Sequence, residues 1–166
     1  MAEILDYLER KTIADTTPGE LFRMNIRGGL AVCINILRTD GGGILVGALK
    51  SGENDYPIWF NASSNAVCHS YGTNWMIEPE YGDESFPKNQ NLENTLKVLF
   101  IQPNAAILRF DAPGRGGSDF DAIAADLGGS GRVNQDDTAL PVRKWRIWHT
   151  AQSRDRAGAV PVVSFG

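Results

Sequence analysis

Glycine clusters in the first third of the chain allow only short secondary-structure elements. A pair at 28–29 and a triplet at 41–43 enclose residues 30–38, which are rich in valine and isoleucine. Glycine interrupts helices and branched side chains favour extended backbone, so this segment is predicted to be a strand. The apolar residues 44–49 follow the triplet directly. We therefore expect a hairpin of two buried strands with its loop around Asp40.

Residues 17–26 carry two conflicting patterns. Thr17-Pro18-Gly19-Glu20 has the spelling of a helix-capping box with proline at the first helical position. Apolar side chains at 22, 24 and 26 alternate with polar ones, as they do in a strand buried on one face. The glycine pair would leave a helix room for only about two turns, so the strand is favoured.

Short apolar and aromatic segments continue along the chain. Residues 58–60, 66–71 and 74–78 suit antiparallel strands in a meander, because asparagine, serine and glycine separate them. Two last strands are expected near 142–150 and 159–165.

The clearest hairpin in the sequence lies after the middle of the chain. Residues 95–102 and 105–111 are apolar and flank the turn pair Pro103-Asn104. An acidic surface loop is predicted before it at 79–94, and a linker is predicted after it at 128–138.

Two short amphipathic helices complete the prediction, one at 2–11 and one at 118–127. Strands outnumber helices and do not alternate with them regularly, which favours antiparallel over parallel sheets. We therefore predict a mainly β or α+β fold, an antiparallel two-layer sandwich with two short helices, in a single domain over residues 1–166.

The charge of the chain limits its partners. The protein has a formal net charge of −4 and a pI near 5.1. It therefore lacks the overall basic character that supplies most non-specific affinity for nucleic acid, so nucleic acid is not expected as a partner. No apolar run approaches the roughly 20 residues that cross a bilayer, so no membrane span is predicted. The N-terminal residues lack the regions of a signal peptide, which predicts a cytoplasmic protein.

One segment of this acidic chain concentrates positive charge and interleaves it with aromatic side chains. It contains Arg143, Lys144, Trp145, Arg146 and Trp148. This composition can bind anionic groups or an acidic partner. We predict a non-enzymatic binding or assembly module that engages a protein partner, or a second copy of itself, through this segment. An edge strand protected by arginine and lysine would have the same composition, and that alternative stays open.

A thiol-dependent hydrolase or deamidase is the alternative function, with Cys68 as nucleophile and His149 as base. His69 is adjacent to Cys68, but neighbouring residues of a strand point to opposite faces. Serine and asparagine at 63–65 make the surroundings of Cys68 polar, whereas free cysteine is usually buried. The cysteines and histidines lack zinc-ligand spacing, so neither a metal nor a cofactor is predicted.

Two further segments could hold a small anionic or polar ligand. The glycines of the turn at 113–118, together with Arg115, could hold an anion, although Ser118 also suits a structural helix cap. Aromatic residues near asparagines suit a sugar or another small polar ligand, or they fill a core. These aromatic residues are Trp59, Tyr71 and Trp75, and the asparagines are Asn61, Asn65 and Asn74.

Overall fold

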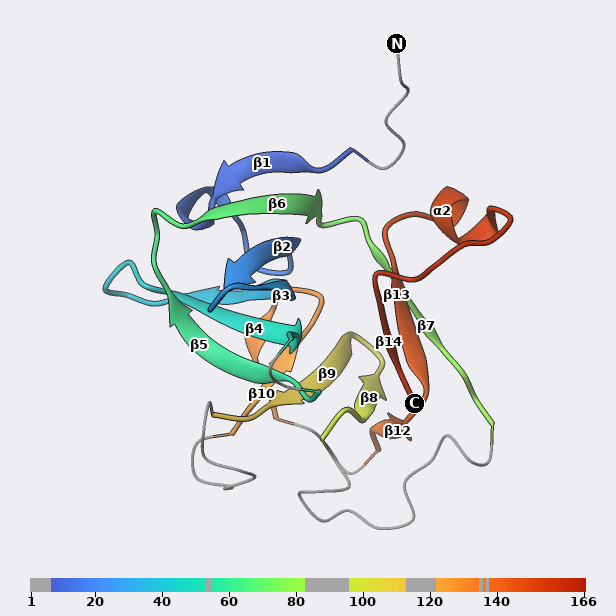
Figure 1. Ribbon diagram of the computed structural model, residues 1–166. Helices are drawn as coiled ribbons and strands as arrows, with labels where there is room; N and C mark the ends of the chain where they lie inside the picture. The colour runs from blue at the N-terminus through green and yellow to red at the C-terminus, as the bar shows by residue number, and fades with distance from the viewer. Residues whose placement is uncertain (1–6, 53–54, 83–95, 113–121, 135, 137) are drawn as a thin grey trace.

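The fold consists of antiparallel strands in three sheets (Figure 1). The structure is a computed structural model, and it describes residues 7–52, 55–82, 96–112, 122–134, 136 and 138–166. The largest sheet has six strands. In order across the sheet they are β1 (Glu9–Thr12), β6 (Val67–Gly72), β2 (Leu21–Ile26), β3 (Gly29–Arg38), β4 (Ile44–Lys50) and β5 (Ile58–Ala62). A 3-10 turn, η1 (Ile13–Asp15), follows β1.

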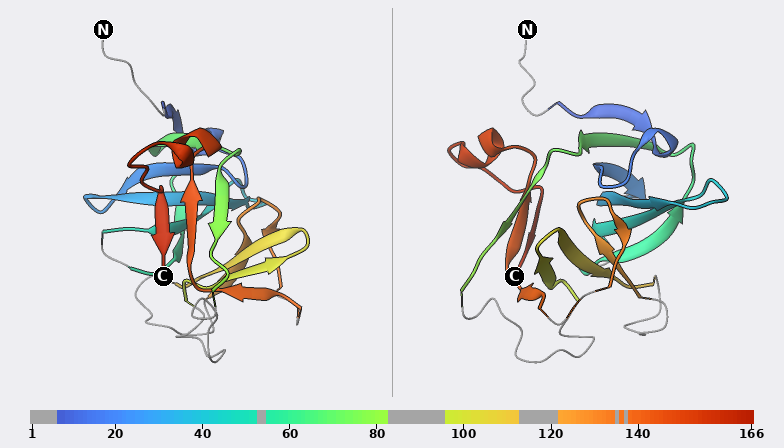
Figure 2. Two further views of the ribbon diagram at one scale, coloured as in Figure 1. Left: turned by 90° about the vertical axis from the view of Figure 1, so that its right-hand side faces the viewer. Right: turned by 180° about the vertical axis from the view of Figure 1, so that it is seen from behind.

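Two smaller sheets come mainly from the second half of the chain. The five-stranded sheet has the order β11 (Gly131–Arg132), β10 (Ile123–Asp126), β9 (Ala105–Phe110), β8 (Leu99–Gln102) and β12 (Leu140–Val142). The three-stranded sheet has the order β14 (Val163–Phe165), β13 (Trp145–Trp148) and β7 (Met76–Pro79). Its strands lie side by side in the left view of Figure 2, below the short helix α2 (Ala151–Asp155).

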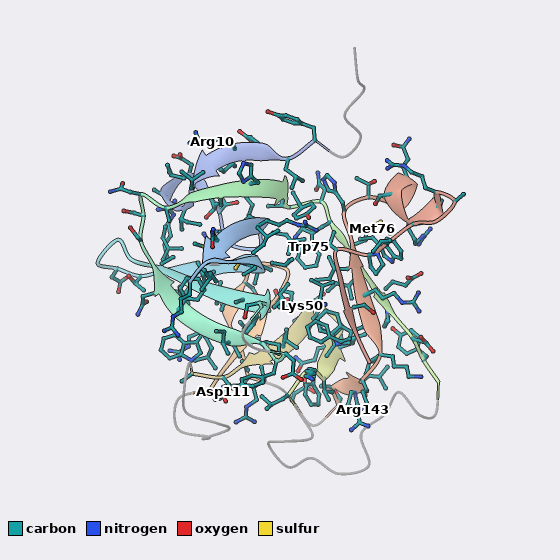
Figure 3. All side chains as sticks on the ribbon, in the orientation of Figure 1. Arg10, Lys50, Trp75, Met76, Asp111 and Arg143 are labelled. Atoms are coloured by element: carbon teal, nitrogen blue, oxygen red, sulfur yellow. The ribbon has the colours of Figure 1, made fainter. Side chains whose placement is uncertain are left out.

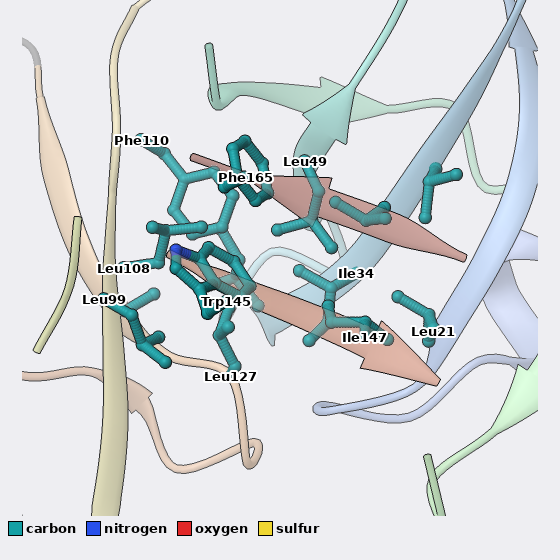
Figure 4. Close-up of a cluster of buried hydrophobic side chains, with 14 of the residues drawn as sticks. Leu21, Ile34, Leu49, Leu99, Leu108, Phe110, Leu127, Trp145, Ile147 and Phe165 are labelled. Atoms are coloured by element: carbon teal, nitrogen blue, oxygen red, sulfur yellow. The ribbon is translucent and has the colours of Figure 1, made fainter. Parts of the chain in front are cut away.

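Side chains from all three sheets meet in one hydrophobic core (Figure 4). Leu21 and Ile34 come from the six-stranded sheet, Leu108 from the five-stranded sheet, and Trp145 and Phe165 from the three-stranded sheet. The two smaller sheets therefore pack on one face of the large sheet. The predicted β-rich antiparallel fold is confirmed.

A second hydrophobic core lies on the opposite face of the six-stranded sheet. Phe22, Cys33, Val46 and Cys68 belong to it. Successive residues of a strand point to opposite faces, so β3 is buried on both sides of the sheet. Burial on both faces explains why residues 30–38 read as an almost continuous apolar run.

Gly47 and Asp111 join the six-stranded sheet to the five-stranded sheet. A Cβ atom added at Gly47 of β4 would lie 2.3 Å from the ring of Phe110. Glycine is therefore required for this close approach. The next residue, Asp111, accepts a backbone hydrogen bond from Trp59 and donates one to Pro57, each at 2.9 Å. These contacts fix the end of β9 against β5.

Several sequence predictions agree with the structure. The β3–β4 and β8–β9 hairpins both form, with turns at the expected positions. Residues 21–26 form strand β2, as the alternating pattern favoured. The capping-box spelling before β2 still makes one of its hydrogen bonds, because the Thr17 backbone N–H donates to the Glu20 carboxylate at 2.9 Å.

Both predicted helices are wrong where the structure describes them. Residues 9–11 of the predicted helix 2–11 belong to strand β1, which pairs with β6. Residues 123–126 of the predicted helix 118–127 form β10, which pairs with β9. Isolated helices of only about three turns are marginal, so pairing with an open sheet edge outweighs the amphipathic pattern. Residues 2–6 and 118–121 lie outside the described residues.

Three further predictions need correction. The predicted linker 128–138 includes strand β11. The predicted meander of residues 58–78 does not form, because β6 lies between β1 and β2 and β7 belongs to another sheet. Helix α2 was not predicted, although Thr150 and Ser153 form its capping box. Of the predicted acidic loop 79–94, the first residue ends β7 and residues 83–94 lie outside the described part of the chain.

Candidate functional site

Trp145, at the centre of the basic-aromatic segment, is part of the main core. Its ring stacks on Phe165 with the ring centroids 4.5 Å apart, and 1% of the residue is exposed. Its indole N–H donates a hydrogen bond to the Lys97 carbonyl at 2.8 Å. The indole is therefore unable to stack on a ligand without unfolding the core.

Arg146 and Trp148 are bound to carboxylates of the same sheet region. The Trp148 indole N–H donates to Glu78 at 2.7 Å, and Trp148 is buried. Arg146 is opposite Glu78 in the register of β13 and β7, and its guanidinium lies 3.2 Å from the Glu80 carboxylate. Arg146 is therefore paired with two carboxylates of the same sheet region in partly exposed ion pairs.

Arg143 and Lys144 lie between β12 and β13. Arg143 is exposed, whereas Lys144 is half-buried, and its side chain lies next to Gly166. Figure 3 shows Arg143 near the lower end of the molecule, far from Arg10 at the top. Of the five residues predicted to contact a partner, Arg143 is the one fully exposed side chain.

Cys68 is buried in the second core with Cys33, and both thiols are free. Burial, reinforced by the nearby negative charge of Glu20, raises the pKa of the Cys68 thiol to about 11. A nucleophilic cysteine needs the opposite shift, because the thiolate is the reactive form. The polar residues at 63–65 do not expose the thiol.

His149 lies on the other side of the six-stranded sheet from Cys68. It lines a small cavity with Tyr71 and Arg23, whose strands direct these side chains away from the Cys68 face. The His149 and Tyr71 rings meet edge to face at 5.0 Å. The structure therefore does not bring the predicted nucleophile and base together.

Arg115 and the whole glycine-rich turn at 113–118 lie outside the described residues. The anion site predicted for Arg115 therefore stays a prediction. Trp59 and Tyr71 belong to the six-stranded sheet, Trp75 precedes β7, and all three side chains pack against the main core.

A cavity of about 490 Å³ lies between β7 and the β8–β9 hairpin. Its wall is mainly apolar and includes Trp75, Ile77, Leu99, Ile101 and Leu127. Figure 3 shows Trp75 near the centre of the molecule, between the large sheet and the three-stranded sheet. Pockets for small ligands have this size range and this predominantly apolar lining.

Trp75 is fixed by one hydrogen bond, which positions its ring in the cavity wall. The indole N–H donates to the Gly19 carbonyl at 2.8 Å. Gly19 has a φ of +84°, and a Cβ atom there would lie 3.1 Å from the backbone of Gly128. Two glycine turns therefore pack backbone to backbone, and Gly19 and Gly128 both line the cavity with Trp75.

The polar part of the cavity wall is almost uncharged. Gln102 and Asn104 come from the β8–β9 turn, and Thr73 comes from the segment before β7. Asp126 is the charged residue among the described lining residues. The wall thus combines an aromatic ring, aliphatic side chains and two amides.

Asp126 is a structural residue of this wall. One carboxylate oxygen accepts hydrogen bonds from the backbone N–H groups of Ala106 and Gly128, and the other accepts from the backbone and hydroxyl of Ser130. Burial alone would raise the pKa of Asp126, but these hydrogen bonds outweigh it and lower the pKa. The carboxylate therefore stays ionised near neutral pH and holds β10 against β9.

Comparisons with protein-family models, curated proteins and solved structures find no match to this chain. The candidate sites therefore depend on the chain's own geometry. Within the described ranges, no helix has the length and apolar character needed to cross a membrane.

Sequence reasoning missed most of the cavity. The sequence pattern groups Trp75 with nearby asparagines. In the cavity wall, however, Trp75 occurs together with Gly19 and Leu127, which are remote from it in sequence. The Pro103-Asn104 turn was recognised only as a turn, although it carries the amides of Gln102 and Asn104. Sheet packing brings these residues together, and no local pattern records it.

Proposed function

We propose that the protein is a non-enzymatic binding module that holds a small, neutral and mainly apolar molecule between β7 and the β8–β9 hairpin. The observation that carries this proposal is the cavity of about 490 Å³. Trp75 supplies an aromatic face, and the amides of Gln102 and Asn104 also line the cavity, although the Gln102 oxygen accepts a hydrogen bond from the Asp136 backbone N–H at 2.9 Å. A ligand with an apolar body and one polar group fits this distribution.

The electrostatics of the wall support a neutral ligand. All four hydrogen bonds to Asp126 come from the protein, so its carboxylate has little capacity to bind a ligand cation. Among the lining residues that the structure describes there is no histidine, cysteine, lysine or arginine. A binding role is therefore better supported than acid–base or nucleophilic catalysis.

The thiol-dependent alternative receives less support. Cys68 is buried, its pKa is raised to about 11, and His149 lies on the other face of the sheet. A partner contact through the basic-aromatic segment depends chiefly on Arg143, which is exposed.

The proposal is tested with the neutral dye N-phenyl-1-naphthylamine, whose fluorescence rises in an apolar site. We expect the parent protein to bind the dye and Ile101→Trp, which fills the cavity, to bind it at least about tenfold more weakly. Leu30→Trp is the matched control, because it adds a similar side chain at a residue that is 61% exposed. Its affinity should equal that of the parent protein.

Circular dichroism checks that each variant folds. If Ile101→Trp does not fold, Ala105→Leu provides a smaller insertion from the same wall. A parent protein that does not bind the dye, or a folded cavity variant that binds as tightly as the parent, contradicts the proposal.

A further inference from the structure

A second cavity, of about 260 Å³, contains an arginine with an unsatisfied buried donor. Arg23 of β2 lines this cavity with Tyr71 and His149, and Leu8 and Val160 contribute apolar walls. The Nε atom of Arg23 is buried and has no hydrogen-bond partner in the described part of the protein. A buried donor without a partner is costly, so such groups in native proteins call for a specific explanation.

Within the described residues, the Arg23 guanidinium lies over an aromatic ring and is not paired with a carboxylate. Its central carbon lies 5.7 Å from the centre of the Tyr71 ring, and that ring meets His149 edge to face at 5.0 Å. A cation–π contact with tyrosine leaves the charge of the guanidinium in place. The group is therefore positioned in advance to bind an anion.

Two more basic side chains continue from Arg23 toward the edge of the six-stranded sheet. Arg23 is the cross-strand partner of His69, and His69 is the partner of Arg10 on β1. Directly paired residues share one face of a sheet, so the three side chains form a row. Both Arg10 and His69 are exposed. We call Arg10, His69 and Arg23 the basic row.

Carboxylates on neighbouring elements are engaged with other groups. Glu20 binds Lys11 at 2.7 Å and also Ser70, on the opposite face of the sheet. Asp155 binds Arg154 at 2.9 Å, and Glu78 accepts the indole N–H of Trp148. No carboxylate is among the described residues that line this cavity.

We propose that the cavity binds a small organic phosphate. Its phosphate group would contact the basic row, with Arg23 nearest to the cavity, and its apolar part would lie against Leu8 and Val160. Guanidinium groups hydrogen-bond phosphate oxygens strongly, and clustered cations attract anions locally even when the net charge of the protein is negative. The proposed site is distinct from the cavity between β7 and the β8–β9 hairpin, so the two proposals stand independently.

Calorimetric titration of the full chain with phenyl phosphate tests this site. We expect phenyl phosphate to bind and Arg23→Gln to weaken its binding by about tenfold or more, because a charged hydrogen-bond donor is lost. Arg132→Gln is the matched control, since Arg132 is an exposed arginine on the five-stranded sheet. It should bind phenyl phosphate as the parent protein does. Binding of the neutral dye should be the same in both variants.

A second variant, Arg10→Gln, keeps the proposal testable if Arg23→Gln does not fold, because Arg10 is exposed and its replacement leaves the cavity wall intact. This variant should bind phenyl phosphate several-fold more weakly. Three results would overturn the proposal: no binding to the parent protein, equal affinity in a folded Arg23→Gln or Arg10→Gln variant, or benzoate binding as tightly as phenyl phosphate.

Discussion

The protein has two basic regions, and they differ in whether carboxylates of the protein pair with their arginines. In the segment 143–148 the tryptophans are buried and Arg146 lies against Glu78 and Glu80. In the basic row, the Arg23 guanidinium lies over the Tyr71 ring, and Arg10 and His69 are exposed. The first region is concentrated in sequence, whereas the second is assembled from three strands. Basic residues that are neighbours in sequence can thus serve packing, while basic residues far apart in sequence can gather on one face of a sheet.

Replacing Trp145 with alanine should give the largest effect and tests the structural side of this comparison. The indole is buried against Phe165 and bonded to the Lys97 carbonyl. We expect the free energy of unfolding to fall by about 3–5 kcal/mol, as for other large-to-small changes in cores. Urea denaturation measures it. A loss below about 1 kcal/mol would mean that Trp145 is not part of the core.

The adjacent cations of β1 show the same contrast at shorter range. Lys11 binds Glu20 at 2.7 Å, whereas the neighbouring Arg10 faces the opposite side of the sheet. Breaking the inner pair with Glu20→Gln should lower the free energy of unfolding by about 2 kcal/mol at neutral pH, because Lys11 and Ser70 lose a charged acceptor. The control is Glu9→Gln, since Glu9 lies 3.5 Å from Lys11 but is exposed. Glu9→Gln should change the free energy of unfolding very little.

The pH dependence of stability follows from the same pair. Burial opposes ionisation of Glu20, but hydrogen bonds from Lys11, Ser70 and Thr17 outweigh it and lower the pKa of the carboxyl group. The folded state therefore holds this proton less tightly than the unfolded state. The stabilisation is present at neutral pH and is lost as the pH falls through the carboxyl range, around pH 4 and below. Urea denaturation across this range should show a flatter pH dependence for Glu20→Gln than for the parent protein.

Charge reversal at exposed arginines should have the smallest effect on stability and the clearest effect on binding. Arg143→Glu and Arg10→Glu should each change the free energy of unfolding by about 0.5 kcal/mol or less, since both side chains are exposed. Phenyl phosphate binding should weaken only in Arg10→Glu.

The segment 143–148 has its own binding measurement. If Arg143 contacts a partner or a second copy of the chain, light scattering should show less self-association, or a pull-down less partner, for Arg143→Glu at low salt. The difference should shrink as salt screens the exposed charge. Unchanged association at low salt would leave this segment with the structural role alone.

Local patterns predicted the strands that depend on local sequence. The β3–β4 and β8–β9 hairpins were predictable because turn residues separate two apolar runs. Residues 9–11 and 123–126 were predicted as helix from their amphipathic spacing, which is also compatible with a strand added to a sheet edge. The available sheet edge, and not the segment itself, decides between the two.

The candidate sites were harder to predict because they depend on strand order. Arg23 and His69 become neighbours only because β6 lies between β1 and β2. Trp75 meets Gly19 through a turn that no spacing rule connects to it. In contrast, the composition of segment 143–148 was visible at once, but the burial of its tryptophans depends on β7 and β14.

The position of β6 also determines the order in which the chain can fold during synthesis. In the described structure β1 pairs with β6 alone, and one edge of β2 pairs with β6 as well. The ribosome makes β1 and β2 first, so these edges have no partner until Val67–Gly72 emerges. Local hairpins such as β3–β4 can form earlier, since their contacts are close in sequence. Strand β1 is therefore synthesised before the other described strands and is among the last that can join the large sheet.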